Sequence, residues 1–311
     1  LRGTEQLLVV PEQLSQPCKE ENDRPIIGVL TQPALGREYV AGSYVKYLEA
    51  AGARVVALRY RWSKEELVDM AKSLNGLLLP GGNAELSKGA PYYDASAVLF
   101  EFALEQNRQG KFFPVWGTCL GFEQLHVLAS GDNSTVLSAS GDFDSEDFAS
   151  PVTLTEHAMS SDLVGNMPEH LVSAMTREPI TFNAHKQGIS PRIFHDNPKL
   201  VAFFTPLATF KDRKGKPFMA IVEAKHGLPV YGTQFHPEKA IFEWFEPSGI
   251  PHTPNAILLA QYTANFFVQK ARCSPNSFPG GFHNASRHMI QLTVKRIVET
   301  PNQYFAQVYE F

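Results

Sequence analysis

The sequence predicts an α/β protein: a three-layer α/β/α sandwich around a mostly parallel central sheet, with an added antiparallel hairpin. Short apolar runs alternate with helical patterns four times between residues 25 and 130. These runs are apolar throughout, which is typical of parallel strands that are covered on both faces. Two further β-rich runs flank the turn "KDRKGK" and predict the hairpin.

In the first half of the chain, local sequence signals support the alternation of strands and helices. Val45 and Leu48 recur at helical spacing, and Gly52 marks the end of that helix. Ser63, followed three residues later by Glu66, forms a capping box that begins the next helix. The predicted strands are 25–32, 53–59, 76–82 and 112–116, and the predicted helices are 41–52, 63–74, 94–109 and 120–130.

The second half mixes strands with one long helix. We predict strands at 200–210, 217–224 and 229–235, and a helix over 254–272 that has Pro254 in its first turn. Two short runs in the tail, "MIQLTV" and "YFAQVYEF", also have a β-like composition. We therefore expect an N-terminal extension, 1–24, and a single domain, 25–311, that ends in a tail, 273–311.

Composition excludes several classes of partner. The chain of 311 residues has a formal net charge of −4 and no basic stripe, so nucleic acid is not expected to bind. No apolar run reaches the roughly 18 residues of a membrane span. No cysteines and histidines have the spacing of a zinc site, and we expect neither a metal nor an organic cofactor.

Cysteines and glycosylation sequons bear on the compartment. Cys18 and Cys273 flank the expected core; they either pair with each other or are two unpaired surface thiols. Asn133-Ser-Thr and Asn284-Ala-Ser are candidate glycosylation sites in loop-like sequence, and they favour a secretory or lysosomal route.

The segment "GTCLG" has the form of a nucleophile elbow. Cys119 stands between Gly117 and Gly121, directly after a predicted strand and before a predicted helix. The two glycines allow the strand and helix backbones to approach closely, and the helix N-terminus favours a thiolate. Cys119 is therefore the candidate nucleophile.

One of the ten histidines is placed to act as its base. His236 directly follows the strand 229–235, and Glu238 lies two residues further on, beyond Pro237. A carboxylate at this position can orient the imidazole, which completes a Cys–His–Glu triad.

The segments "PGG", "GTCLGFE" and "HPEK", in this order, resemble the class I glutamine amidotransferase superfamily, which has a flavodoxin-like fold. More narrowly, "FPVWGTCLGFE", "FNAHK" and "YGTQFHPEK" resemble the gamma-glutamyl hydrolase family, peptidase family C26. The resemblance spans roughly residues 25–272.

The resemblance implies a role for each matching residue. Cys119 matches the nucleophile, His236 the general base and acid, and Glu238 the third triad position. Gly82 and Leu120 match the two backbone donors of the oxyanion hole.

His185 matches a second active-site histidine of the hydrolases, and Glu123 and Tyr44 are further candidates for the substrate pocket. Glu123 stands where ammonia-producing relatives usually carry Gln, and its carboxylate is a candidate to hold an ammonium or an amide N–H of the substrate. The implied reaction is hydrolysis of γ-glutamyl bonds in folate poly-γ-glutamates through a thioester. The resemblance also implies that the protein is a homodimer. It implies a protein that is located in the lysosome or vacuole or is secreted.

Other interpretations stay open. The chain is alternatively the glutaminase of an amidotransferase, or a hydrolase of another γ-glutamyl amide. An interpretation from a different class is a binding protein on this fold with a dead site. The sequence does not distinguish terminal from internal cleavage of the polyglutamate. It also does not identify which cationic side chains bind the polyglutamate.

Overall fold

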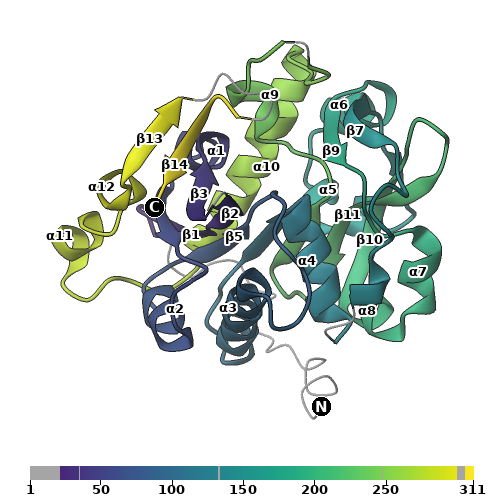
Figure 1. Ribbon diagram of the computed structural model, residues 1–311. Coiled ribbons are helices and arrows are strands. Elements are labelled where there is room, and N and C mark those ends of the chain that lie inside the picture. The colour runs from purple at the N-terminus through teal and green to yellow at the C-terminus, as the bar shows by residue number, and fades with distance from the viewer. Residues whose placement is uncertain (1–21, 35, 132–133, 247, 300–304) are drawn as a thin grey trace.

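The computed structural model describes residues 22–34, 36–131, 134–246, 248–299 and 305–311 (Figure 1). Its largest sheet has the strand order β4-β1-β5-β6-β12-β11-β10-β8. The first five strands in this order are parallel, and β11, β10 and β8 continue the sheet in antiparallel pairs. The bounds are β1 Ile26–Leu30, β4 Arg54–Leu58, β5 Gly76–Leu79, β6 Val115–Thr118, β8 Thr153–Leu154, β10 Phe204–Lys211, β11 Pro217–Ala224 and β12 Val230–Thr233. The predicted fold class is confirmed.

Helices cover both faces of this sheet (Figure 1). Ile27 and Val29 of β1 belong to one core cluster, together with α1 (Gly42–Ala50) and α10 (Pro254–Arg272). Ile26 and Leu30 of the same strand belong to a second cluster, with α2 (Lys64–Ala71), α3 (Pro91–Arg108) and α4 (Leu120–Ala129). Successive side chains of one strand thus enter opposite layers, as the apolar runs predict.

The first half follows the prediction closely. The capping box at the start of α2 is present, with Ser63 accepting from Glu66 N and the Glu66 side chain accepting from Ser63 N. Helix α3 begins at Pro91, three residues earlier than predicted. A proline suits the first helical turn because its missing N–H has no partner there in any case.

Two predictions in the second half are wrong in part. Residues 200–203 belong to a helix, α8 (Pro198–Phe203), and the strand starts only at Phe204. The Asn197 side chain accepts from the N–H groups of Lys199 and Leu200 and so caps this helix. The tail run "MIQLTV" contains the helix α12 (Ile290–Thr293) instead of a strand. The antiparallel hairpin of β10 and β11 is confirmed.

The described part of the chain also contains two smaller sheets. One has the order β13-β14-β3-β2 and joins the tail to the start of the chain; the other pairs β7 with β9. The bounds are β2 Gln32–Ala34, β3 Arg37–Ala41, β13 Arg296–Glu299, β14 Gln307–Glu310, β7 Ser145–Ser150 and β9 Thr181–His185. Of the first sheet, only β14 corresponds to a predicted run. The remaining helices are α5 Asp162–Gly165, α6 Glu169–Arg177, α7 Pro191–Asp196, α9 Lys239–Phe242 and α11 Gly281–Ser286.

The segment 1–24 was predicted as an extension, and residues 1–21 lie outside the described part. Asn22 donates its N–H to Arg272 O over 2.8 Å, so the described end of this segment packs against the end of α10. Among the described helices, none is long and apolar enough to cross a membrane.

Candidate active site

Cys119 occupies a strained turn between β6 and α4. Its backbone has φ 52° and ψ −108°, a conformation that residues other than glycine rarely adopt, and the residue is only 5% exposed. A Cβ on Gly121 would lie 1.9 Å from Leu79 O, and one on Gly117 would lie 2.7 Å from Gly121 O. Only glycine fits at both positions, which agrees with the elbow that the sequence predicts.

The protonation of Cys119 differs from the expectation of a ready thiolate. Burial is the main reason that the pKa of the thiol is raised well above its usual value, and Glu123 and Glu238 raise it further. A hydrogen bond from Leu120 N–H, at the start of α4, lowers the pKa, but it does not outweigh burial. The buried cysteine is therefore a thiol that needs a base.

His236 stands at the carboxyl end of the neighbouring strand. Strands β6 and β12 are parallel, with Thr118 opposite Thr233, so the residues that follow them meet at one edge of the sheet. His236 Nδ1 lies 2.7 Å from Glu238 Oε1, and both side chains are buried. The predicted histidine–glutamate pair is thus within hydrogen-bonding distance.

The loop after β5 brings the nucleophile, the histidine and Tyr44 together. A Cβ on Gly81 would lie 2.6 Å from His236 Cε1, 2.8 Å from the Tyr44 hydroxyl and 3.3 Å from Cys119 Cβ. Gly81 N–H donates to the Tyr44 hydroxyl over 2.7 Å. Gly82, one of the two candidate oxyanion donors, is the next residue after Gly81, around which these three side chains lie.

Glu123 faces the same site and is held by a glutamine. Gln234 Nε2 donates to Glu123 Oε1 over 3.0 Å, and the glutamate is only 3% exposed. Burial raises the pKa of Glu123 to about 8. At neutral and acid pH the side chain is therefore a carboxylic acid, and not the carboxylate that the sequence suggests.

His185 lies at the end of β9, next to the histidine of the pair. Its Nδ1 lies 2.6 Å from Gln187 O, and its Nε2 lies 3.2 Å from Asn183 Oδ1. The pKa of His185 is lowered to about 4, mainly by burial and less by the nearby His236, while the hydrogen bond with Gln187 O acts in the opposite direction. The ring is therefore neutral across most of the physiological range.

Sequence reasoning missed two glutamines at this edge, Gln32 and Gln234. Both are buried: Gln234 contacts Glu123, and Gln32 packs against Gly82. A signal in the sequence could have identified them: each glutamine is a polar residue just after an apolar strand. Such positions are candidates for a binding site because ligands of parallel sheets bind at the carboxyl ends of the strands.

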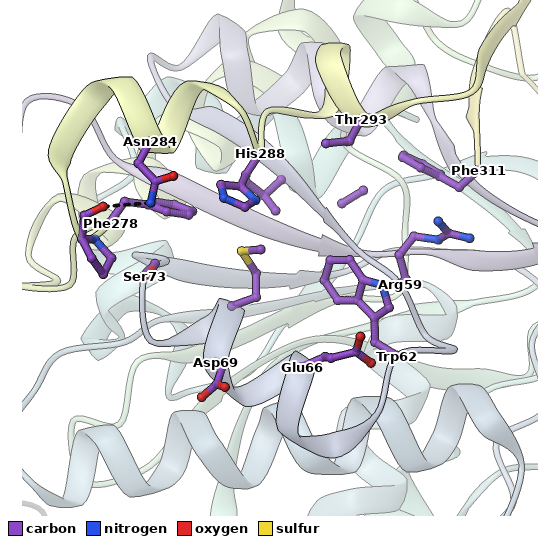
Figure 2. Close-up of a pocket in the computed structure, with 14 residues that line it drawn as sticks. Arg59, Trp62, Glu66, Asp69, Ser73, Phe278, Asn284, His288, Thr293 and Phe311 are labelled. Carbon is purple, nitrogen blue, oxygen red and sulfur yellow. Dashed lines mark hydrogen bonds between the residues drawn. The ribbon is translucent and has the colours of Figure 1, made fainter.

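A cavity of about 510 Å³ lies elsewhere, between β4, α2 and the C-terminal tail (Figure 2). Trp62, Met70 and His288 line it, together with Asn284. None of the residues of the triad, the oxyanion hole or the substrate pocket lines this cavity, so its size alone does not mark the active site.

For the two candidate glycosylation sites and for the two cysteines that flank the core, only one residue of each pair lies in the described part of the chain. Asn284 lies in α11, and its Nδ2, the atom that would carry a glycan, donates to Pro279 O over 2.8 Å. Asn133 lies outside the described residues. Cys119 is a free thiol, whereas Cys273 is disulfide-bonded. The alternative of two unpaired surface thiols is therefore wrong for Cys273. Whether its partner is Cys18 stays open, since Cys18 lies outside the described residues. No cluster of three or more metal-ligating side chains occurs within the described ranges.

The fold and the site define a class: cysteine hydrolases built on the glutamine amidotransferase-like fold. The glutaminase domain of the Trypanosoma brucei CTPS, solved with bound acivicin, has this fold, with a TM-score of 0.50 and 16% identity. The alignment covers 83% of this chain and 97% of that one.

Within this class, the model of the family Peptidase C26 matches residues 25–238, and the chain belongs to this family. The gamma-glutamyl hydrolase of Mus musculus is 42% identical, and the alignment covers 85% of this chain and 83% of the relative. The gamma-glutamyl hydrolase of Homo sapiens is 40% identical, over 86% and 83%. Gamma-glutamyl hydrolase B of Dictyostelium discoideum is 38% identical, over 83% and 75%.

Proposed function

We propose that this protein is a gamma-glutamyl hydrolase that cleaves the γ-glutamyl bonds of folate poly-γ-glutamates. The observation that carries the proposal is the meeting of Cys119, His236 and Tyr44 around Gly81, with Glu238 2.7 Å behind the imidazole. The names of the similar curated proteins supply the substrate bond. The chemistry follows from these residues.

The first half of the reaction forms a thioester. With Nδ1–H donating to Glu238, the other imidazole nitrogen of His236, Nε2, is free to take the proton of Cys119 as sulfur attacks the γ-carbonyl carbon. The carbonyl oxygen becomes an oxyanion, for which Gly82 N–H and Leu120 N–H are the candidate donors. The C–N bond then breaks, and the imidazolium gives its proton to the leaving amine.

The second half releases the γ-glutamyl product. Water loses a proton to His236 and attacks the thioester carbon, and the sulfur leaves and recovers a proton. Glu123 and His185, both neutral at acid pH, serve in this proposal as hydrogen-bonding groups for the glutamyl part of the substrate. A neutral Glu123 can donate a hydrogen bond as well as accept one.

Cleavage assays between pH 4.5 and 7.5 test the proposal directly. A folate pentaglutamate is offered against free glutamine, with Cys119→Ala as the control. We expect glutamate or γ-linked oligoglutamates to be released by the native chain and not by the variant, with little glutamine turnover. Glutamine turnover without polyglutamate cleavage would instead assign the chain to the glutaminases. Lack of both activities would support a binding protein.

The compartment and the oligomeric state are part of the proposal. We propose a lysosomal, vacuolar or secreted glycoprotein, because disulfides such as that of Cys273 persist in oxidising compartments. Peptide mapping after endoglycosidase treatment would show whether Asn133 and Asn284 carry glycans.

We also propose a homodimer that buries apolar side chains of the tail. Phe282, Leu292 and Ile297 are 60%, 69% and 48% exposed in the single chain. Sedimentation of the native chain against a Leu292→Glu variant tests this proposal. A monomeric native chain would contradict it.

A further inference from the structure

Gln32 lies directly against the loop that carries the candidate oxyanion donor. It is 1% exposed, and its Nε2 donates to Pro80 O over 3.4 Å. The space where a Cβ of Gly82 would stand is 2.3 Å from Gln32 Cδ and from Gln32 Oε1. The carboxamide therefore fills the position that a side chain at residue 82 would need, and Gly82 cannot move toward it.

The orientation of the carboxamide follows from Pro80. A carbonyl oxygen only accepts hydrogen bonds, so the nitrogen of the amide faces Pro80 O, while its oxygen lies next to Gly82. The next residue of the loop has a second partner, because the Tyr44 hydroxyl accepts from Gly81 N–H over 2.7 Å. Side chains of β2 and of α1 thus both hold the segment 80–82.

Gln32 is itself held by the small sheet. Thr31, just before it, donates its hydroxyl to Glu38 Oε2 over 2.6 Å. Gln32 pairs with Tyr39 of β3, and β3 pairs in turn with β14 of the tail. Phe311 N–H donates to Glu38 O over 2.9 Å. A continuous set of backbone and side-chain contacts therefore links the C-terminus to Gln32.

We propose that Gln32 is a positioning residue that aims the Gly82 N–H at the developing oxyanion, and that the tail strand β14 serves the active site by holding Gln32 in place. The proposal rests on the proposed function, since the oxyanion belongs to the hydrolysis of a γ-glutamyl bond. It also gives the small sheet, whose Val40, Ala41 and Tyr309 pack into the core beside α1, a role in catalysis.

Two variants of Gln32 and one matched control test this role. Gln32→Met keeps the size of the side chain and removes the bond to Pro80 O. Gln32→Glu keeps the shape, and only its protonated form can donate to that carbonyl. Gln124→Met makes the same change at another buried glutamine, whose Nε2 donates to Ser96 Oγ over 2.6 Å, away from the loop.

Three measurements separate positioning from general damage. For Gln32→Met we expect kcat on folate pentaglutamate to fall about 10- to 100-fold, because a displaced oxyanion donor loses much of its effect, while KM stays within about twofold. Alkylation of Cys119 by iodoacetamide forms no oxyanion, and its rate should stay within about twofold. Gln32→Glu should recover activity at low pH and lose it as the carboxyl group ionises.

Hydrogen exchange of residues 77–84, the end of β5 and the loop after it, adds a measurement that needs no substrate. Gln32→Met should speed exchange there by about tenfold or more, and Gln124→Met should not. Unchanged kcat together with unchanged exchange would overturn the proposal, and so would a rise in KM at constant kcat. Parallel loss of alkylation would point to general damage and would equally count against it. A native chain that cleaves no γ-glutamyl bond would refute the proposed function, and the exchange result would still decide the placement of the loop.

Discussion

Replacing Glu123 by Gln should remove a pH dependence of stability that is built into the active site. Glu123 is buried, and its pKa rises from 4.5 to about 8 in the folded chain. Gln is the shape of a protonated glutamate and can still accept the hydrogen bond from Gln234 Nε2. Glu123→Gln therefore fixes the side chain in the neutral form that the fold prefers.

The sign follows from proton counting. Between pH 4.5 and about 8 the folded chain keeps the proton of Glu123, whereas the unfolded chain has lost it. The free energy of unfolding of the native chain therefore falls as pH rises through this window. Each pKa unit corresponds to about 1.36 kcal/mol, so the full window amounts to about 5 kcal/mol.

Urea denaturation from pH 5 to 8 measures the effect as a difference between two proteins. We expect Glu123→Gln to gain stability relative to the native chain steadily with pH, by about 1.4 kcal/mol per unit. Glu169→Gln, the same change at an exposed first-turn glutamate of α6, serves as the control and should show no such slope. A difference for Glu123→Gln that does not change with pH would refute the reasoning.

Three further outcomes are expected. Gly81→Ala should lower kcat by roughly 100-fold or more without unfolding the chain, measured by steady-state kinetics and circular dichroism, because its Cβ would lie 2.6 Å from His236 Cε1. Glu238→Gln should lower kcat by about 10- to 1,000-fold, with KM little changed, since the imidazolium loses the negative charge of its partner; equal kcat would remove Glu238 from the triad. His126, whose pKa burial lowers to about 4, charges first in the unfolded chain, so about 3 kcal/mol of stability is lost as pH falls from 6.5 to 4. His126→Leu should flatten this loss in urea titrations, and an unchanged acid slope would show that the ring is not the cause.

The local parts of the structure were predictable because local rules decide them. The capping box of Ser63 and Glu66 and the glycines around Cys119 each act within a few residues, and the structure has both. The continuous apolar run 200–210 was different, since such a run fits a buried helix as well as a strand. The Asn197 cap decides in favour of a helical turn there.

Non-local parts were beyond the sequence pattern. The pairing of β14 with β3 joins the end of the chain to its beginning, and neither strand predicts its partner. The placement of Gln32 against Gly82 depends on that pairing. Protonation also depends on the finished fold, because burial raises the pKa of Glu123 only in the folded chain, where the hydrogen bond from Gln234 opposes the rise without cancelling it.

The same burial decides how the site holds charge. It raises the pKa of Cys119 and of Glu123 and lowers that of His185, so each of these groups is pushed toward its neutral form. These three groups then add no negative charge to the site before the reaction, and the substrate oxyanion is the charge that develops there. A charge in such dry surroundings is strongly stabilised by fixed dipoles that already point at it, and poorly by groups that must first move. The positions of the Gly82 and Leu120 N–H groups should therefore limit the rate more than the acidity of the thiol.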